Sequence, residues 1–218
     1  MAKVSMSDLV YEAILDRIIK CQYAPGSLLT EEQLVQELHA SRTPIRAALI
    51  RLERDNLVRV LPKKGVRVIP ITPDYVRDIF DIRESVELFA LRNFGQNFKK
   101  DHLLKYLKEF APVSENAELN GGYYTLDSQF HLELVSLAGN MFMDPFYRML
   151  QHHLTRISTV CGKSLDGRLN TSNEEHRNIV RYLLRDDLPA AEEALLYHLK
   201  QGRYASFRCL LSASCFDE

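Results

Sequence analysis

The sequence predicts a mainly α fold, in which a winged helix-turn-helix of three helices and a β-hairpin precedes an all-α helical bundle. In the first part, two short helical patterns meet at a tight turn near residue 40, and a hairpin pattern follows at residues 57–69. In the second part, apolar residues recur at helical spacing almost to the end of the chain. The prolines Pro70 and Pro73 place the expected boundary between residues 72 and 73.

The composition indicates a chain that folds around a sizeable core. Hydrophobic residues make up 46% of the 218 residues, and no apolar run approaches the roughly 20 residues of a membrane-spanning helix. The four cysteines form no C-x-x-C pair, which favours reduced thiols over a disulfide framework. The first residues lack the apolar core of a signal peptide. We therefore expect a cytoplasmic protein.

Charge is distributed unevenly along the chain. The net charge is −1, but residues 41–67 contain eight lysines and arginines against two acidic residues, a local charge of +6. A basic module on an acidic body favours contact with nucleic acid at one end of the protein. The alternative interpretation is an ordinary solvated face, which runs of charge often form.

Two helices are expected before the basic region. The first covers about residues 7–20 and ends before a break at residues 24–26, Ala-Pro-Gly. The second begins at Thr30, which forms a capping-box pattern with Gln33, and runs to Leu38. A short turn then leads into a third helix, so the pattern is that of a helix-turn-helix.

The third helix, over residues 41–52, has the pattern of a helix that reads DNA. Thr43 is its expected N-cap, and Pro44 suits the first turn, where a missing N–H is tolerated. Arg46 lies on the face opposite the core and Arg42 at the helix start, so their guanidinium groups suit guanine edges and phosphates. The inward face consists of Ile45, Ala48, Leu49 and Leu52.

A basic hairpin follows this helix. The β-rich runs at residues 57–61 and 66–69 are separated by Pro62, Lys63, Lys64 and Gly65. A hairpin in this place is a wing, and its basic tip suits phosphates or the minor groove.

These motifs, in this order, resemble the GntR family of bacterial transcription regulators. The matching residues are Pro25, Gly26, Leu28, Ser41 to Arg46, Ala48, Leu49, Arg51, Leu52, Leu57, Val58, Pro62 and Gly65. The resemblance implies operator contacts by Arg42, Thr43 and Arg46, with Gly65 at the tip of the wing. The chain departs from the family pattern at the turn and in the two helices, where it has His39, Ala47 and the run Glu31, Glu32 and Gln33.

We therefore expect residues 1–72 to form a DNA-binding domain. Its expected contacts with double-stranded operator DNA come from Ser41, Arg42, Thr43, Arg46, Arg51, Lys63, Lys64 and Gly65. When bound to DNA, the protein is expected to be associated with the bacterial nucleoid.

Six helices are expected after the boundary, near residues 74–97, 100–115, 122–138, 143–162, 167–186 and 188–211. Glycine, asparagine and aspartate mark the breaks between them, at residues 95–97, 120–122, 139–140 and 186–187. The second part of the chain is therefore expected to be an all-α bundle.

Four polar side chains fall on the apolar faces of three of these helices: Asp127, His131, His176 and His198. Buried polar groups need partners, and one divalent cation would satisfy all four. The nitrogen and oxygen donors suit Zn, Ni or Mn. The alternative is that each histidine is a hydrogen-bonded core residue, which is the commoner role of a single histidine.

The helical part resembles the FCD effector domain of the FadR subfamily of GntR regulators. The matching stretches are residues 126–131, 139–140, 175–179 and 186–198, and the helix count is similar to that of the six-helix VanR-like branch. The resemblance implies that Asp127, His131, His176 and His198 are metal ligands. Residues 73–218 are therefore expected to bind a ligand and to form a homodimer.

Arg83 lies on an apolar stripe and needs a carboxylate partner. One candidate is Glu87, one helical turn further on. The other is the carboxylate of a bound effector, and the family resemblance favours this second interpretation.

Together these features predict a DNA-binding regulator, most simply a repressor, whose operator affinity changes when a small organic acid binds. One alternative is a metal-independent regulator whose bundle only dimerises. The other is a metal-dependent hydrolase, but no companion general base or nucleophile motif accompanies the four ligands, so an enzyme is not expected.

Overall fold

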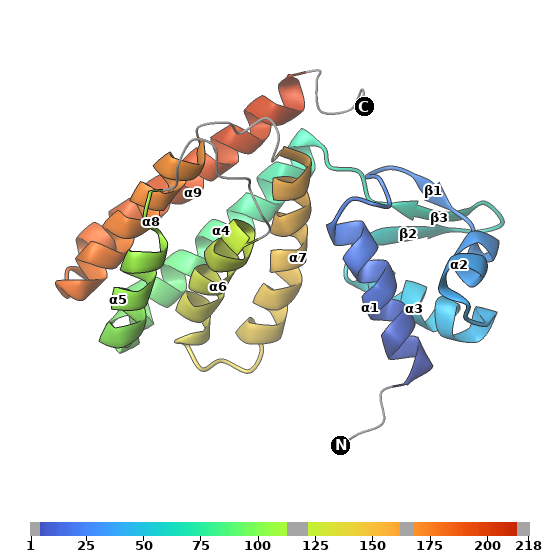
Figure 1. Cartoon of the computed structure of the whole chain (residues 1–218), viewed down its shortest axis with the longest axis horizontal. Helices are drawn as coiled ribbons and strands as arrows, with labels where there is room; N and C mark the ends of the chain where they lie inside the picture. The colour runs from blue at the N-terminus through green and yellow to red at the C-terminus, as the bar shows by residue number, and fades with distance from the viewer. Residues whose placement is uncertain (1–4, 113–121, 162–167, 213–218) are drawn as a thin grey trace.

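Two groups of elements, each with its own buried apolar core, make up the computed structural model, which describes residues 5–112, 122–161 and 168–212. Figure 1 shows them side by side, with the first group drawn in blue to cyan. We call the first group, residues 6–68, the head, and the second, residues 73–211, the bundle. The mainly α fold with a wing is as the sequence predicted.

The head contains three helices and a small sheet. Its elements are α1 (Met6–Ile19), β1 (Leu28–Leu29), α2 (Glu31–Leu38), α3 (Arg42–Arg54), β2 (Val58–Leu61) and β3 (Gly65–Val68). The strands β2 and β3 form the predicted wing hairpin. The short strand β1 was not predicted; it pairs with β3 and makes a three-stranded antiparallel sheet in the order β1-β3-β2.

The caps of the head helices follow local sequence, with one exception. Thr30 and Gln33 form the predicted capping box at the start of α2. The prediction that Thr43 caps α3 was wrong, because the helix already begins at Arg42 and Ser41 occupies the N-cap position. The early start follows from His39, whose φ of 50° ends α2 in a tight left-handed turn. Glycine adopts this conformation without strain, whereas a residue with a side chain, such as His39, seldom does.

The bundle consists of six α-helices and one 3-10 turn in the described part of the chain (Figure 1). They are α4 (Pro73–Phe94), η1 (Gly95–Asn97), α5 (Lys100–Glu109), α6 (Gly122–Ser136), α7 (Met143–Cys161), α8 (Arg168–Leu184) and α9 (Leu188–Leu211). The helix α5 ends earlier than predicted, because Ala111 precedes Pro112 and that position disfavours helical backbone. The predicted break at residues 120–122 lies largely outside the described residues. None of the described helices is long and apolar enough to cross a membrane.

A buried polar network lies where the bundle meets the head. The guanidinium of Arg156 on α7 donates to the Tyr75 hydroxyl at 2.9 Å and to the Ile69 carbonyl at 2.6 Å. The Tyr75 hydroxyl lies 2.5 Å from Nδ1 of His153. The His153 side chain also hydrogen-bonds to the backbone of Asp55 in the head. Burial lowers the pKa of His153 to about 4, so its ring is neutral at pH 7. The network therefore joins α7, the first turn of α4, the linker and the end of α3.

Candidate metal centre and DNA-reading face

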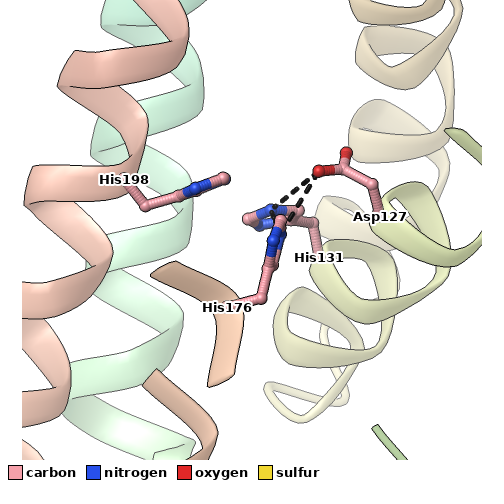
Figure 2. Close-up of side chains that lie close together, drawn as sticks. All are labelled: Asp127, His131, His176 and His198. Atoms are coloured by element: carbon pink, nitrogen blue, oxygen red, sulfur yellow. Dashed lines mark hydrogen bonds and ion pairs between the residues drawn. The ribbon is translucent and has the colours of Figure 1, made fainter. Parts of the chain in front are cut away.

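The four predicted ligand residues meet in the centre of the bundle. Asp127 and His131 come from α6, His176 from α8 and His198 from α9, and Figure 2 shows their side chains pointing toward one another. One nitrogen or oxygen atom from each lies within 4.8 Å of the others. The carboxylate of Asp127 lies 3.2 Å from Nε2 of His176 and 3.9 Å from Nε2 of His131.

Each histidine of the cluster is held by its other ring nitrogen. Nδ1 of His131 lies 2.6 Å from the Glu87 carboxylate, and Nδ1 of His198 lies 2.8 Å from the Glu175 carboxylate. Nδ1 of His176 lies 2.7 Å from the backbone carbonyl of Ser172. Carboxylate and carbonyl oxygens only accept hydrogen bonds, so all three Nδ1 atoms donate. When the rings are neutral, the Nε2 lone pairs are therefore left to face the centre.

Electrostatics keep four groups of the site in their acceptor forms: Glu87, Asp127, His131 and His198. Burial alone would raise the pKa of Glu87, but Arg83 and His131 lower it to about 2. Burial opposes ionisation of Asp127 as well, yet the facing histidines and Arg83 hold its pKa below the usual range. Burial lowers the pKa of His131 and, with the nearby His176, lowers that of His198 to about 3.

The arrangement has a gap in its hydrogen bonding that a cation would fill. Nε2 of His131 and Nε2 of His176 lie 3.1 Å apart, although both are acceptors when the rings are neutral. Two lone pairs and the Asp127 carboxylate then converge with no donor between them. Three imidazoles and one carboxylate suit a divalent transition metal.

Arg83 extends the site along α4. Its Nε donates to the Glu87 carboxylate at 2.6 Å, so the partner that helical spacing suggested is present. Its Nη2 is buried and has no hydrogen-bond partner within the described residues. Two further residues bind the carboxylates that hold the histidines. Tyr147 donates to Glu87, and the guanidinium of Arg168 binds the Glu175 carboxylate in a bidentate pair.

The expected DNA-reading residues gather at the far side of the head. Arg42 and Arg46, at the start of α3, line a hollow of about 400 Å³ together with the wing tip residues Lys63, Lys64 and Gly65. Gly65 has a φ of 110°, and a Cβ added there would lie 2.4 Å from the Leu29 carbonyl oxygen. Only glycine therefore lets the wing pass so close to β1. Ser41 and Thr43 are exposed at the same end of α3.

The two arginines expected to contact DNA from the start of α3 are paired within the head. Arg46 binds the Glu31 carboxylate through Nε and Nη2, and Arg42 lies 3.0 Å from the Glu32 carboxylate. Both acids belong to the first turn of α2. The sequence does not predict these pairs, because they join two different helices.

Arg51 lies apart from the other expected DNA-binding residues. It follows Arg42 by nine positions, which is half a turn out of phase on a helix. Its Nη1 lies 2.7 Å from the Asp8 carboxylate, and its guanidinium covers the Tyr11 ring at 3.9 Å. These contacts pack α3 against α1, and the expectation that Arg51 contacts DNA stays a prediction.

Comparison with known families agrees with both halves of this architecture. The family of bacterial regulatory proteins called gntR matches residues 6–68, and the FCD domain matches residues 78–201. The chain belongs to the GntR family. It is a transcriptional regulator with an FCD domain, and the family is one of DNA-binding regulators and not of enzymes.

Individual relatives match this GntR regulator over most of its length. The transcriptional repressor RspR of Escherichia coli is 24% identical over 195 residues, which cover 88% of this chain and 85% of RspR. A GntR regulator of Rhodococcus has a similar structure, with a TM-score of 0.75 at 22% identity, covering 94% of this chain and 99% of that one.

A further solved structure is a Zn2+-bound FCD domain of a transcriptional regulator. It has a TM-score of 0.53 at 23% identity and covers 65% of this chain and 97% of that one. At this identity the likeness concerns the fold of the bundle.

Proposed function

We propose that this GntR regulator binds operator DNA as a homodimer and that residues 1–72 make the contacts. Within the head, the start of α3 and the wing tip face the same hollow, as a major-groove reader and its wing require. The proposed contacts are Ser41, Arg42, Thr43, Arg46, Lys63, Lys64 and Gly65. Arginines suit guanine edges and phosphates, while the lysines suit phosphates beside the wing.

We further propose that the four ligand residues, Asp127, His131, His176 and His198, hold one divalent metal ion such as Zn, Ni or Mn. The supporting observation is the convergence of four acceptors within 4.8 Å with no donor among them when the imidazoles are neutral. The Nδ1 partners orient the three rings before a metal binds, which favours affinity.

The proposed effector is a small organic acid. A bound divalent ion would supply a Lewis-acid position for one carboxylate oxygen. Arg83 supports a second contact, because its Nη2 is buried without a partner and its charge acts on Asp127. A ligand that reached both groups would complete the hydrogen bonding of Arg83.

The helix α4 offers a route from this site to the head. Its middle holds Arg83 and Glu87, and its first turn holds Tyr75. Tyr75 belongs to the buried network with Arg156 and His153 that touches the linker and the head. A tilt of α4 would thus move the heads of a dimer, whose spacing must match half-sites about 34–36 Å apart.

The proposed direction of regulation is repression, with release of the operator when the acid binds. A repressor among the relatives, RspR, supports this choice. To change operator occupancy strongly, the acid must favour one head spacing by several kcal/mol.

The test measures metal content and operator affinity in the same preparation. The full-length protein is dialysed, its metal is quantified, and the operator is obtained by selection from random DNA. We expect about one divalent ion per chain, loss of the ion in His176→Ala, and loss of DNA binding in Arg46→Ala.

Candidate acids are then titrated against the operator complex of the metal-loaded protein. We expect at least one small carboxylate to lower operator affinity, and Arg83→Lys to weaken that response while metal is retained. No metal in the purified protein and no response to any acid would support a bundle that only dimerises.

A further inference from the structure

A groove lies between the head and the bundle, and none of the four proposed metal ligands lines it. It has a volume of about 530 Å³ and takes its walls from the end of α1, one face of α6 and one face of α7. Ile19 and Leu132 provide apolar walls from α1 and α6. In Figure 1, α1 and α7 run alongside each other at this junction.

The charge of the groove has one sign. Lys20, the C-cap of α1, and Arg148 on α7 line it, and no aspartate or glutamate is among its described lining residues. Lys20 lies 2.9 Å from the Asp16 carboxylate, outside the groove. Arg148 is exposed and has no ion pair within the described part of the chain. An anion would therefore meet one uncommitted guanidinium and one ammonium group.

Two buried polar atoms near the groove lack partners. Gln151 is only 8% exposed and lines the groove, and its Nε2 has no hydrogen-bond partner in the described structure. The same holds for Nδ1 of the neighbouring His152. Buried polar groups in folded proteins are nearly always paired, and an unpaired one needs an explanation. A polar ligand seated between α1 and α7 would give both groups partners once the two side chains turn toward the groove.

We propose that this groove is a second ligand site, which takes a small organic anion with an aromatic or otherwise apolar body. The anionic group would lie toward Arg148 and Lys20, and the apolar body would lie against Ile19 and Leu132. The site is separate from the metal centre. Leu132 lies about 100° around α6 from the stripe of Asp127 and His131. The occupant touches both head and bundle, so it would hold them together.

The probe for this site is 1-anilinonaphthalene-8-sulfonate, an aromatic sulfonate, titrated into the full-length protein and followed by fluorescence. We expect Arg148→Glu to weaken binding about tenfold, because the change removes an attraction and adds a repulsion. The matched control is Arg185→Glu, which makes the same change on the exposed turn between α8 and α9.

A second variant tests the space and leaves the charges intact. Thr155→Trp puts an indole into the groove and is expected to weaken binding to a similar degree. Arg148 is exposed and Thr155 is partly exposed, so neither substitution is expected to prevent folding. Circular dichroism checks that both variants fold. Wild-type affinity in either variant overturns the proposal. In Arg148→Glu it would mean that the probe does not contact this guanidinium, and in Thr155→Trp that the probe does not occupy the groove.

Discussion

The Glu31 carboxylate holds the guanidinium of Arg46 along one edge, with Nε at 3.0–3.1 Å and Nη2 at 2.9 Å. The two residues belong to different helices of the head. Since this edge is occupied, the end of the guanidinium remains as the fork that a guanine would meet. Glu31 therefore orients the arginine that we propose reads the operator.

Glu31→Ala is expected to reduce sequence discrimination more than it reduces affinity. Loss of the carboxylate frees Arg46 and also removes a negative charge near the DNA. The ratio of Kd for random DNA to Kd for the selected operator should fall about three- to tenfold. Fluorescence anisotropy at fixed salt measures both constants. Glu193→Ala, a distant exposed position, is the control; a wild-type ratio in Glu31→Ala would contradict this role.

Glu175→Gln is expected to weaken metal binding about tenfold, because the residue orients a proposed ligand without touching the metal position. Its carboxylate accepts from Nδ1 of His198 and binds Arg168. Competition with a chelator of known affinity measures the change. Glu174→Gln is the matched control, since this neighbour pairs with Arg181 on the exposed side of α8. Equal metal affinity in the two variants would mean that the Glu175 contact does not orient the ligand.

The sequence predicts the four metal-ligand candidates but not their supporting contacts. His131, His176 and His198 each fall on a helical stripe of apolar residues, and helical spacing alone reveals such a position. The pairing of Glu87 with His131 joins two residues that lie 44 positions apart in the sequence and on different helices. Only the packing of α4 against α6 creates that contact, and no periodicity encodes it.

Tertiary contacts also explain where the structure of the head differs from what the sequence predicts. The strand β1 has only two residues, too few to show an alternating pattern, and it exists because β3 lies beside it. Arg51 looks like another basic residue of α3 until α1 packs against it and supplies Asp8. Composition thus located the basic module, whereas tertiary contacts decided which arginines remain at the hollow.

Arg83→Met is expected to lower the free energy of unfolding by about 3–5 kcal/mol, because Glu87 would stay buried and lose its positive partner. The side chains of this pair are 8% and 0% exposed. In the surface pair Arg92–Glu192 they are 56% and 30% exposed. Arg92→Met should therefore cost less than about 1 kcal/mol. Denaturant unfolding of both variants measures the difference; similar losses would contradict a buried charge at Arg83.

Stability is expected to fall as the pH drops from about 6.5 to about 4, in part because of His153. Its folded pKa of about 4 lies below the 6.5 of a free histidine, so the unfolded chain takes up a proton first. The loss attributable to this residue is up to about 3 kcal/mol below pH 4. Unfolding curves across this range should show a shallower slope in His153→Gln. An unchanged slope would contradict the assignment to His153.

Gly65→Ala is expected to destabilise the head and weaken operator binding, whereas Gly139→Ala should affect only stability. Both glycines have positive φ, 110° and 56°, so both substitutions strain the backbone. Only at Gly65 would the new Cβ meet another atom, the Leu29 carbonyl oxygen at 2.4 Å; nothing lies within 4 Å at Gly139. The clash should cost roughly 1–3 kcal/mol beyond the shared strain and displace the wing. Thermal unfolding and operator anisotropy measure the two effects. Equal stability and equal operator affinity in the two variants would show that β1 moves away from the new Cβ without loss of free energy.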